Sequence, residues 1–278
     1  MTFSLALCQM PVKADKAENL KTALEYIESS SKLADIIILP EMWCCPYEAS
    51  NFPLYAESAD GPLCTAMSEA AQKSGKLLIA GSIPESENGK VYNSSFVYGP
   101  DGRQIARHRK AHLFDINVEG GIRFYESDTL SPGNCATVFD TPFGKIGLGI
   151  CYDIRFFHLA DMMAQAGADV LVYPACFNMT TGPAHWHLAL RGRAVDNQVY
   201  TVGVCTARSE ELSYTAYGHS LCCDPWGTVI AEADTGAEII YAEVDTEYIA
   251  KIRRQMPFRS QRRADLTLND FSSGCSKK

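Results

Sequence analysis

The sequence predicts a layered domain of the α/β or α+β class, and two kinds of strand signal lead to this prediction. The run ADIIILPE at 34–41 is continuously apolar and β-branched, which is typical of a strand covered on both faces. The run VYNSSFVYGPDGRQIARHRK at 91–110 indicates two antiparallel strands joined around Asp101-Gly102, a hairpin signal. Because a doubly covered strand needs packing on both sides of its sheet, this mixture indicates several layers.

Strand and helix signals alternate along the rest of the chain. Residues 3–9 alternate loosely between faces and predict a first strand, whereas 17–33 carry apolar residues at helical spacing. We expect the remaining strands at 76–81, 136–140, 145–150, 169–173, 199–205, 217–223, 228–233 and 238–245, and the remaining helices at 63–73, 155–166, 184–197 and 246–255. The polar segment after Pro257 is expected to lie over the surface or to fray.

The composition is that of one soluble globular domain. The chain has 278 residues, 46% hydrophobic and 21% charged, and no Pro/Ser/Gly-rich linker or charge block divides it. We therefore expect a single domain over 1–265 and a polar C-terminal tail over 266–278.

Charge and hydrophobicity exclude two classes of partner. The net charge of −8 disfavours nucleic acid, whose binding needs a concentrated positive surface, and the basic run RHRK at 107–110 does not change this. The N-terminal MTFSLALCQM lacks the basic region and long apolar core of a signal peptide. The densest apolar run, DIIILP, is too short to span a bilayer. We expect a cytoplasmic protein with no membrane partner.

The cysteines and histidines do not predict a metal site. The eleven cysteines are odd in number, and pairs such as Cys44-Cys45 and Cys222-Cys223 are adjacent rather than spaced C-x₂-C. We expect them to be reduced and mostly buried. His185 and His187 stand two residues apart on a predicted helix and therefore point in different directions.

Three reactive side chains follow apolar strands at the point where each strand ends. They are Glu41 after DIIILP, Lys110 after QIARHR and Cys151 after KIGLGI. In covered sheets, ligands gather beyond the carboxyl ends of strands, where loops converge. Taken alone, each residue has an ordinary alternative, namely a solvated loop carboxylate, an exposed hairpin lysine and a core cysteine.

The glycines before Cys151 favour a nucleophile at this position. Gly147 and Gly149 weaken a strand, and a glycine inside a strand marks a sharp bend or a close backbone approach. A sharp strand-to-helix turn lifts a nucleophile out of the sheet and aims backbone N–H groups at the same point. We expect the following helix start to lower the pKa of the thiol. A dinucleotide-binding loop is excluded because Tyr152 stands where G-x-G-x-x-G requires its third glycine.

With these motifs, the sequence resembles the nitrilase superfamily of carbon–nitrogen hydrolases. Glu41 in LPEMW, Lys110 in HRKAHLFDI and Cys151 in GLGICYDIRF match the Glu–Lys–Cys pattern of that family, from residue 3 to about residue 265. The stretches TLSPG, FNMTTGPAHWHL, GRAVDNQVY and DPWG are similar to its omega-amidase branch, which hydrolyses the terminal amide of 2-oxoglutaramate and 2-oxosuccinamate. The resemblance implies a four-layer α-β-β-α sandwich, a homodimer or higher homo-oligomer, and no cofactor.

The resemblance also implies a role for each site residue. Covalent catalysis divides amide hydrolysis into two easier steps, and Cys151 is expected to attack the carboxamide carbon and form a thioester. Glu41 is the expected general base, and Lys110 with the backbone N–H of Tyr152 is expected to face the oxyanion. Glu126 in RFYESDTLSPG matches a second glutamate of the family and is expected to position Lys110 and the substrate amide. Its alternative is a surface loop carboxylate.

Substrate specificity is expected to come from two further residues. Arg155, four residues after the nucleophile, is a candidate for a bidentate clamp on a substrate carboxylate; alternatively, it is a structural ion-pair partner of Asp153 or Asp161. Tyr47 in CCPYEAS matches a position that lines the pocket of similar enzymes.

Several alternatives stay open at this point. His112 is expected to be a hydrogen-bonded structural residue rather than the base of a Cys/His enzyme. His187 and Cys176 stand where similar proteins often have glutamate and alanine, and Cys176 is expected to serve packing. The same chemistry can act on deaminated glutathione or an N-carbamoyl amine, and a metabolite-binding homologue without turnover is a third possibility.

Overall fold

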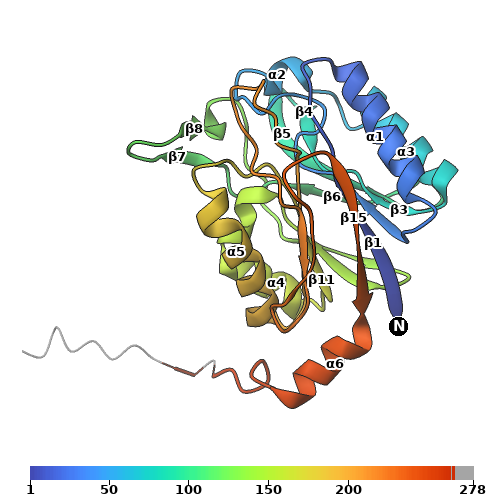
Figure 1. Ribbon diagram of the computed structural model, residues 1–278, viewed down its shortest axis with the longest axis vertical. Helices are drawn as coiled ribbons and strands as arrows, with labels where there is room; N and C mark the ends of the chain where they lie inside the picture. The colour runs from blue at the N-terminus through green and yellow to red at the C-terminus, as the bar shows by residue number, and fades with distance from the viewer. Residues whose placement is uncertain (264, 267–278) are drawn as a thin grey trace, which may run out of the picture.

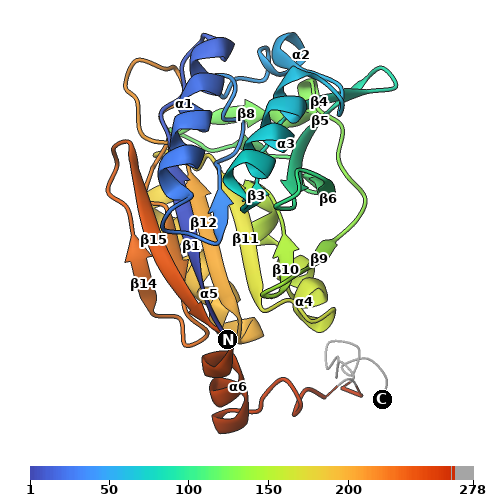
Figure 2. The same cartoon turned by 90° about the vertical axis from the view of Figure 1, so that its right-hand side faces the viewer.

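The chain folds into two β-sheets that pack face to face, with a pair of helices on the outer face of each sheet (Figures 1 and 2). The computed structural model describes residues 1–263 and 265–266. The layered α/β class and the α-β-β-α order that the family resemblance implies are thereby confirmed.

The first sheet contains the N-terminal strands and one strand from near the C-terminus. Its order is β15-β1-β2-β3-β5-β4, and β6 also pairs with β5. The strands are β1 (Thr2–Gln9), β2 (Ile36–Ile38), β3 (Leu77–Ile79), β4 (Ile83–Glu87), β5 (Lys90–Tyr98), β6 (Gln104–Arg109) and β15 (Glu238–Asp245). The pairs β1–β2 and β2–β3 are parallel. Helices α1 (Lys16–Ser30) and α3 (Pro62–Ser74) cover the outer face (Figure 2).

The second sheet has the order β14-β13-β12-β11-β10-β9. Its strands are β9 (Thr137–Thr141), β10 (Gly144–Leu148), β11 (Val170–Ala175), β12 (Tyr200–Cys205), β13 (Leu221–Cys223) and β14 (Val229–Glu232). The central pairs β10–β11 and β11–β12 are parallel. Helices α4 (Phe157–Gln165) and α5 (Gly182–Asn197) cover its outer face (Figure 1).

The side chains of the central strands divide between two cores by alternation. On β2, Ile36 and Ile38 point into the core between the sheets, whereas Ile37 packs beneath the first pair of helices. On β11, Val170 faces the core between the sheets and Leu171 packs beneath α4 and α5. Because both faces of these strands are covered, every position in them is buried.

Shorter elements complete the chain. They are α2 (Phe52–Tyr55), the two-stranded hairpin of β7 (Asp115–Asn117) and β8 (Arg123–Tyr125), the 3₁₀ turns η1 (Glu126–Asp128) and η2 (Cys151–Arg155), and α6 (Thr246–Gln255). The predicted tail at 266–278 lies outside the described residues except for Leu266.

The structure differs from the sequence prediction at several elements. The predicted helix 17–33 ends at Ser30, and 155–166 becomes a helix only at Phe157 because a 3₁₀ turn occupies Cys151–Arg155. The predicted strand 217–223 begins only at Leu221, since the backbone before it is not extended: His219 has a φ of 55°. β4, α2 and the β7–β8 hairpin were not predicted at all.

Candidate active site

Glu41, Lys110 and Cys151 meet at one buried point, although they follow strands of different parts of the two sheets. Glu41 lies beyond β2, Lys110 directly after β6, and Cys151 in the turn after β10. Their exposed fractions are 0%, 0% and 4%. The backbone N–H of Glu41 donates to the carbonyl of Ala175 at 3.4 Å, which links the loop after β2 in the first sheet to the end of β11 in the second.

The Lys110 ammonium is held by three oxygen atoms. Its Nζ donates to Oε1 of Glu41 and Oε1 of Glu126, each at 2.9 Å, and lies 3.3 Å from the hydroxyl of Tyr47. Burial alone would lower the pKa of this ammonium, but the charges of Glu126 and Glu41 outweigh burial and raise the pKa. Lys110 is therefore a fixed positive charge inside the protein.

The two oxygens of the Glu41 carboxyl have different surroundings. Oε1 accepts hydrogen bonds from Lys110 and, at 2.8 Å, from Nδ2 of Asn93. Oε2 is buried and accepts no well-aligned hydrogen bond from any residue that the structure describes. Burial raises the pKa of Glu41, and Lys110 opposes this change. A carboxyl of raised pKa with one free oxygen is suited to take and return a proton.

Cys151 sits at a backbone position that side chains rarely adopt. Its φ is 45°, which is the left-handed region and turns the chain sharply out of the sheet. The glycines before it allow close packing, since a Cβ on Gly149 would lie 2.8 Å from the ring of Tyr173 and one on Gly147 would lie 2.7 Å from Leu171. The strand-to-turn arrangement predicted for Cys151 is confirmed.

The prediction of a lowered thiol pKa was wrong. Burial raises the pKa of the Cys151 thiol well above its usual range, and the neighbouring Glu41 charge raises it further. Lys110 and the backbone N–H of Cys176 act in the opposite direction without reversing the shift. Cys151 is therefore a neutral thiol at rest, and its reactivity depends on a base to remove the proton.

Glu126 and Tyr47 join the same hydrogen-bond network. Oε2 of Glu126 accepts from the backbone N–H of Phe114 at 2.6 Å, and its Oε1 accepts from the Tyr47 hydroxyl at 2.6 Å. Glu126 is completely buried, so the alternative of a surface loop carboxylate is wrong. The network fixes where the Lys110 ammonium points.

Asp153 is a site residue that sequence reasoning missed. Its Oδ2 accepts from the backbone N–H of Ile150 and contacts Nε2 of His108, both at 3.0 Å. Its Oδ1 accepts from the backbone N–H of His112 at 3.0 Å and lies 2.7 Å from Nδ1 of that histidine. Asp153 thereby ties the Cys151 turn to the segment around Lys110. His112 contacts this carboxylate, in keeping with the structural role expected for it.

Arg155 has no carboxylate partner in the part of the chain that the structure describes. Both carboxylate oxygens of Asp153 contact a backbone N–H and a histidine ring. Asp161 pairs with Arg262 at 2.7 Å. The ion-pair alternative for Arg155 is therefore wrong. Its guanidinium lies over the rings of Phe177 and Tyr152, at 5.0 and 5.5 Å from their centroids.

Two small cavities adjoin the reactive groups. One is lined by Phe114, Cys151, Tyr152, Arg155, Cys176, Phe177, Thr181 and Tyr214, and the other by residues that include Glu41, Tyr47, Cys176 and Tyr214. Tyr214, which the sequence did not single out, borders both and donates its hydroxyl to the carbonyl of Cys176 at 2.7 Å. The chemistry-bearing side chains therefore face a narrow, largely enclosed space.

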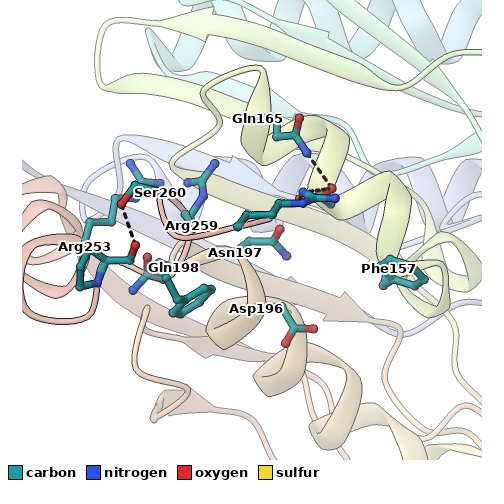
Figure 3. Close-up of a pocket in the computed structure, with 12 residues that line it drawn as sticks. Phe157, Gln165, Asp196, Asn197, Gln198, Arg253, Arg259 and Ser260 are labelled. Atoms are coloured by element: carbon teal, nitrogen blue, oxygen red, sulfur yellow. Dashed lines mark hydrogen bonds and ion pairs between the residues drawn. The ribbon is translucent and has the colours of Figure 1, made fainter. Parts of the chain in front are cut away.

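A wider hollow lies elsewhere on the molecule. It measures about 1170 Å³ and lies between α4, the end of α5 and the segment around α6, where Arg253, Arg259 and Gln198 line it (Figure 3). None of the three reactive residues reaches it. We place the chemistry in the smaller cavities because Cys151 and Arg155 line one of them and Glu41 lines the other.

The two histidines of α5 point apart, as their spacing predicts. Nδ1 of His185 lies 3.0 Å from NH1 of Arg155, whereas Nε2 of His187 lies 2.8 Å from Glu232. Among residues 1–263 and 265–266, no group of three or more His, Cys, Asp or Glu side chains is arranged to hold a metal ion.

The four-layer fold, together with a buried cysteine, carboxyl and ammonium at strand ends, defines a hydrolase of the nitrilase type. Comparison with known proteins agrees, because the carbon-nitrogen hydrolase family model matches residues 4–254. The chain belongs to the carbon-nitrogen hydrolase family, and the family resemblance of the sequence is confirmed.

Individual relatives within this family are similar to the chain over most of its length. The chain is 52% identical to "Omega-amidase NIT2" of Bos taurus and 49% identical to that of Homo sapiens, over 95% of this chain and 96% of each relative. Among solved structures, Saccharomyces cerevisiae Nit3, a member of branch 10 of the nitrilase superfamily, is 42% identical with a TM-score of 0.86, and 94% of this chain and 97% of that chain are covered. The Caenorhabditis elegans NitFhit protein is 31% identical with a TM-score of 0.87, over 96% of this chain and 66% of that chain.

Proposed function

We propose that this enzyme is an omega-amidase that hydrolyses the terminal carboxamide of short 2-oxo dicarboxylate monoamides, such as 2-oxoglutaramate and 2-oxosuccinamate, to the dicarboxylate and ammonia. The observation that carries the proposal is the contact of the Lys110 ammonium with the Glu41 carboxyl beside the Cys151 thiol, in a buried site. The choice of substrate is supported by relatives of about half identical sequence that are named omega-amidases.

In the first half of the reaction, the enzyme is acylated. Oε2 of Glu41, the oxygen left free in the network, takes the proton of the Cys151 thiol as the sulfur forms a bond to the carboxamide carbon. The carbonyl oxygen becomes an oxyanion, which Lys110 and the backbone N–H of Tyr152 stabilise. The C–N bond then breaks, Glu41 gives its proton to the nitrogen, and ammonia leaves a thioester on Cys151.

The second half of the reaction consumes one water. Glu41 takes a proton from the water molecule while the water oxygen bonds to the thioester carbon. Lys110 and the backbone N–H of Tyr152 again stabilise the oxyanion that forms. The C–S bond breaks, the sulfur regains a proton from Glu41, and the dicarboxylate is released. The free thiol and the Glu41 carboxylate are thereby restored, so that one carboxyl serves both halves.

Glu126 and Tyr47 act on Lys110 in this scheme rather than on the substrate carbon. At rest all three Nζ–H groups of Lys110 face oxygen atoms, and the distance to the Tyr47 hydroxyl is the longest, at 3.3 Å. Lys110 can therefore turn one N–H from Tyr47 to the oxyanion while Glu126 and Glu41 keep hold of the ammonium. The free energy that this exchange costs is small, since the hydrogen bond to Tyr47 is the weakest of the three.

Arg155 supplies the charge that distinguishes a substrate carboxylate from an uncharged group. It borders the cavity that contains Cys151, and a guanidinium binds a carboxylate bidentately. Because no carboxylate of the described chain neutralises it, its charge is available to the substrate. Tyr214 lines the same cavity as Arg155, and Tyr47 lines the second cavity, which Tyr214 also borders.

We also propose the assembly and location of the enzyme. Exposed apolar side chains stand on the neighbouring helices α4 and α5, namely Phe157, Met162, Leu188 and Val195, and such a face supports a homodimer or higher homo-oligomer. A single domain over 1–265 is supported by the core between the sheets, to which both ends of the chain contribute. The free cysteines of the described chain support a reducing, cytoplasmic location. No helix in the described residues is both long and apolar enough to cross a membrane.

Ammonia release by the purified protein tests the function directly. We expect turnover of 2-oxoglutaramate that exceeds turnover of deaminated glutathione and of N-carbamoyl amines under the same conditions. Cys151→Ala is expected to abolish it, whereas Cys135→Ala, which changes an exposed thiol, is expected to leave it intact. Faster turnover of another amide would overturn the assignment of the substrate, and full activity in Cys151→Ala would refute the assignment of Cys151 as the nucleophile. Binding of 2-oxoglutaramate without turnover would instead indicate a metabolite-binding protein.

A further inference from the structure

The surroundings of Arg155 are unusual for a half-buried cation. NH1 contacts an imidazole nitrogen of His185 at 3.0 Å, and the aromatic rings of Phe177 and Tyr152 lie beside the guanidinium. Its Nε is buried and has no hydrogen-bond partner among the residues described. Charged groups are almost never fully buried unless they are paired, so the buried Nε of Arg155, which has no partner among the described residues, requires an explanation.

The contact with His185 fixes the state of its ring. A guanidinium has five N–H donors and no acceptor, and it does not lose its charge in proteins. Nδ1 of His185 must therefore carry a lone pair directed at NH1 of Arg155, and the imidazole is neutral with its proton on Nε2. A neutral acceptor orients the guanidinium and leaves its positive charge uncompensated, whereas a carboxylate in the same place would orient and neutralise it.

The start of α5 holds His185 in this position. The backbone N–H of His185 donates to the carbonyl of Thr181 at 2.9 Å, and Thr181 lines the same cavity as Arg155. The next residue, Trp186, is completely buried and donates its ring N–H to the carbonyl of His219 at 2.6 Å. Because Trp186 fixes the rotation of the helix, His185 is directed toward Arg155.

We propose that His185 is a positioning residue for substrate specificity: its neutral imidazole orients the Arg155 guanidinium toward the substrate carboxylate without neutralising it. The inference rests on the proposed function, because it assumes that Arg155 binds that carboxylate. It adds that the partner of Arg155 must be an uncharged acceptor, and that a charged acceptor there weakens binding of anionic amides.

A matched pair of variants separates orientation from charge. In His185→Asn and His185→Asp, an Oδ1 atom stands two bonds beyond Cβ, as Nδ1 does in histidine, and the two variants differ only in charge. His185→Ala removes the acceptor altogether. We expect KM for 2-oxoglutaramate to stay within about twofold in the Asn variant, to rise about fivefold in the Ala variant, and to rise on the order of tenfold or more in the Asp variant.

The expected effects are confined to binding of the charged group. The value of kcat is expected to change less than about twofold in all three variants. An uncharged aliphatic amide is expected to show the same KM in all of them. The Kd of glutarate, measured by calorimetry without any turnover, is expected to follow the same order as KM for 2-oxoglutaramate.

The outcomes distinguish this inference from the proposal on which it rests. Equal KM and equal glutarate Kd in the Asn and Asp variants would overturn the role of His185. Equal losses with charged and uncharged amides would also overturn it, since they would indicate a general structural effect. Arg155→Ala is the separate test of the clamp: if it leaves KM unchanged, the clamp itself fails, whereas a raised KM in Arg155→Ala with unaffected His185 variants would remove only the inference about His185.

Discussion

Asp153 offers a quantitative test of how the Cys151 turn is held, through the substitution Asp153→Asn. Each oxygen of this buried carboxylate accepts from one backbone N–H, Ile150 at Oδ2 and His112 at Oδ1, and also contacts one histidine ring. Whichever way the amide of the variant turns, its NH₂ group faces one of the two backbone N–H groups and leaves that donor unpaired. The remaining bonds lose a charged acceptor.

The expected loss follows from these contacts. An unpaired buried donor costs about 1–3 kcal/mol, and the weakening of the other bonds adds to this, so we expect the free energy of unfolding to fall by about 3 kcal/mol. For a domain of this size, about 2 °C per kcal/mol gives a fall in Tm of about 6 °C. The hydrogen bonds hold the pKa of Asp153 below its usual range despite burial, so the stabilisation is fully present above the ordinary aspartate pKa and is lost as the pH falls through the lowered one.

Thermal unfolding of both proteins at pH 7 and equal concentration is the assay. A fall in Tm of about 6 °C together with a lower kcat would support the role of Asp153 in holding the turn. A Tm within about 1 °C of the parent would refute it.

Three further predictions concern the site and the packing beneath it. Glu41 must be ionised to act as the base, and burial raises its pKa above an ordinary 4.5. We therefore expect kcat/KM, which reports the ionisations of the free enzyme, to decline on the acid side with a midpoint above 4.5, and Glu41→Gln to lower kcat by about 10²-fold or more. A midpoint of the kcat/KM profile at or below 4.5 would contradict this. Tyr47→Phe removes the hydroxyl that donates to Glu126 at 2.6 Å and should lower kcat about tenfold, and steady-state rates equal to those of the parent would exclude this role. Gly149→Ala places a Cβ 2.8 Å from an aromatic ring and should lower the free energy of unfolding by about 1–3 kcal/mol. Gly192→Ala, whose Cβ would meet open space on α5, should raise the free energy of unfolding by up to about 1 kcal/mol. Denaturant unfolding should separate the two variants, and equal midpoints would count against the packing argument.

The reactive residues could be predicted because a pattern in the neighbouring residues marks each of them. Glu41, Lys110 and Cys151 each break an apolar or strand-like run with a polar side chain, and Gly149 marks the bend before the cysteine. These features involve only neighbouring residues, so they can be recognised without knowledge of the fold. That the three meet at one point is not local, and only the family resemblance supplied it before the structure did.

Sequence analysis did not identify residues whose role depends on contacts between several segments. Asp153 is recognisable only when His108, Ile150 and His112 are seen to converge on it. Asn93 reads as an ordinary strand residue, yet it donates to Glu41 from β5. The direction of the Cys151 pKa shift was wrong for the same reason, since the burial and the Glu41 charge that raise it come from distant parts of the chain.

One missed element had a usable signal. The hairpin of β4 and β5 turns at Asn88-Gly89, whose φ values are 52° and 73°, and an Asn-Gly pair between strand-like runs is a strong hairpin indicator. The β7–β8 hairpin has only three residues in each strand, which is too short for a periodic pattern to stand out.

Mass spectrometry of the protein quenched in acid during turnover of 2-oxoglutaramate bears most directly on the central proposal, a covalent cycle at one cysteine. We expect an acyl group on the peptide that contains Cys151, absent when substrate is omitted and absent in Cys151→Ala. Continued ammonia release while that peptide stays unmodified and another residue carries the acyl group would contradict the account.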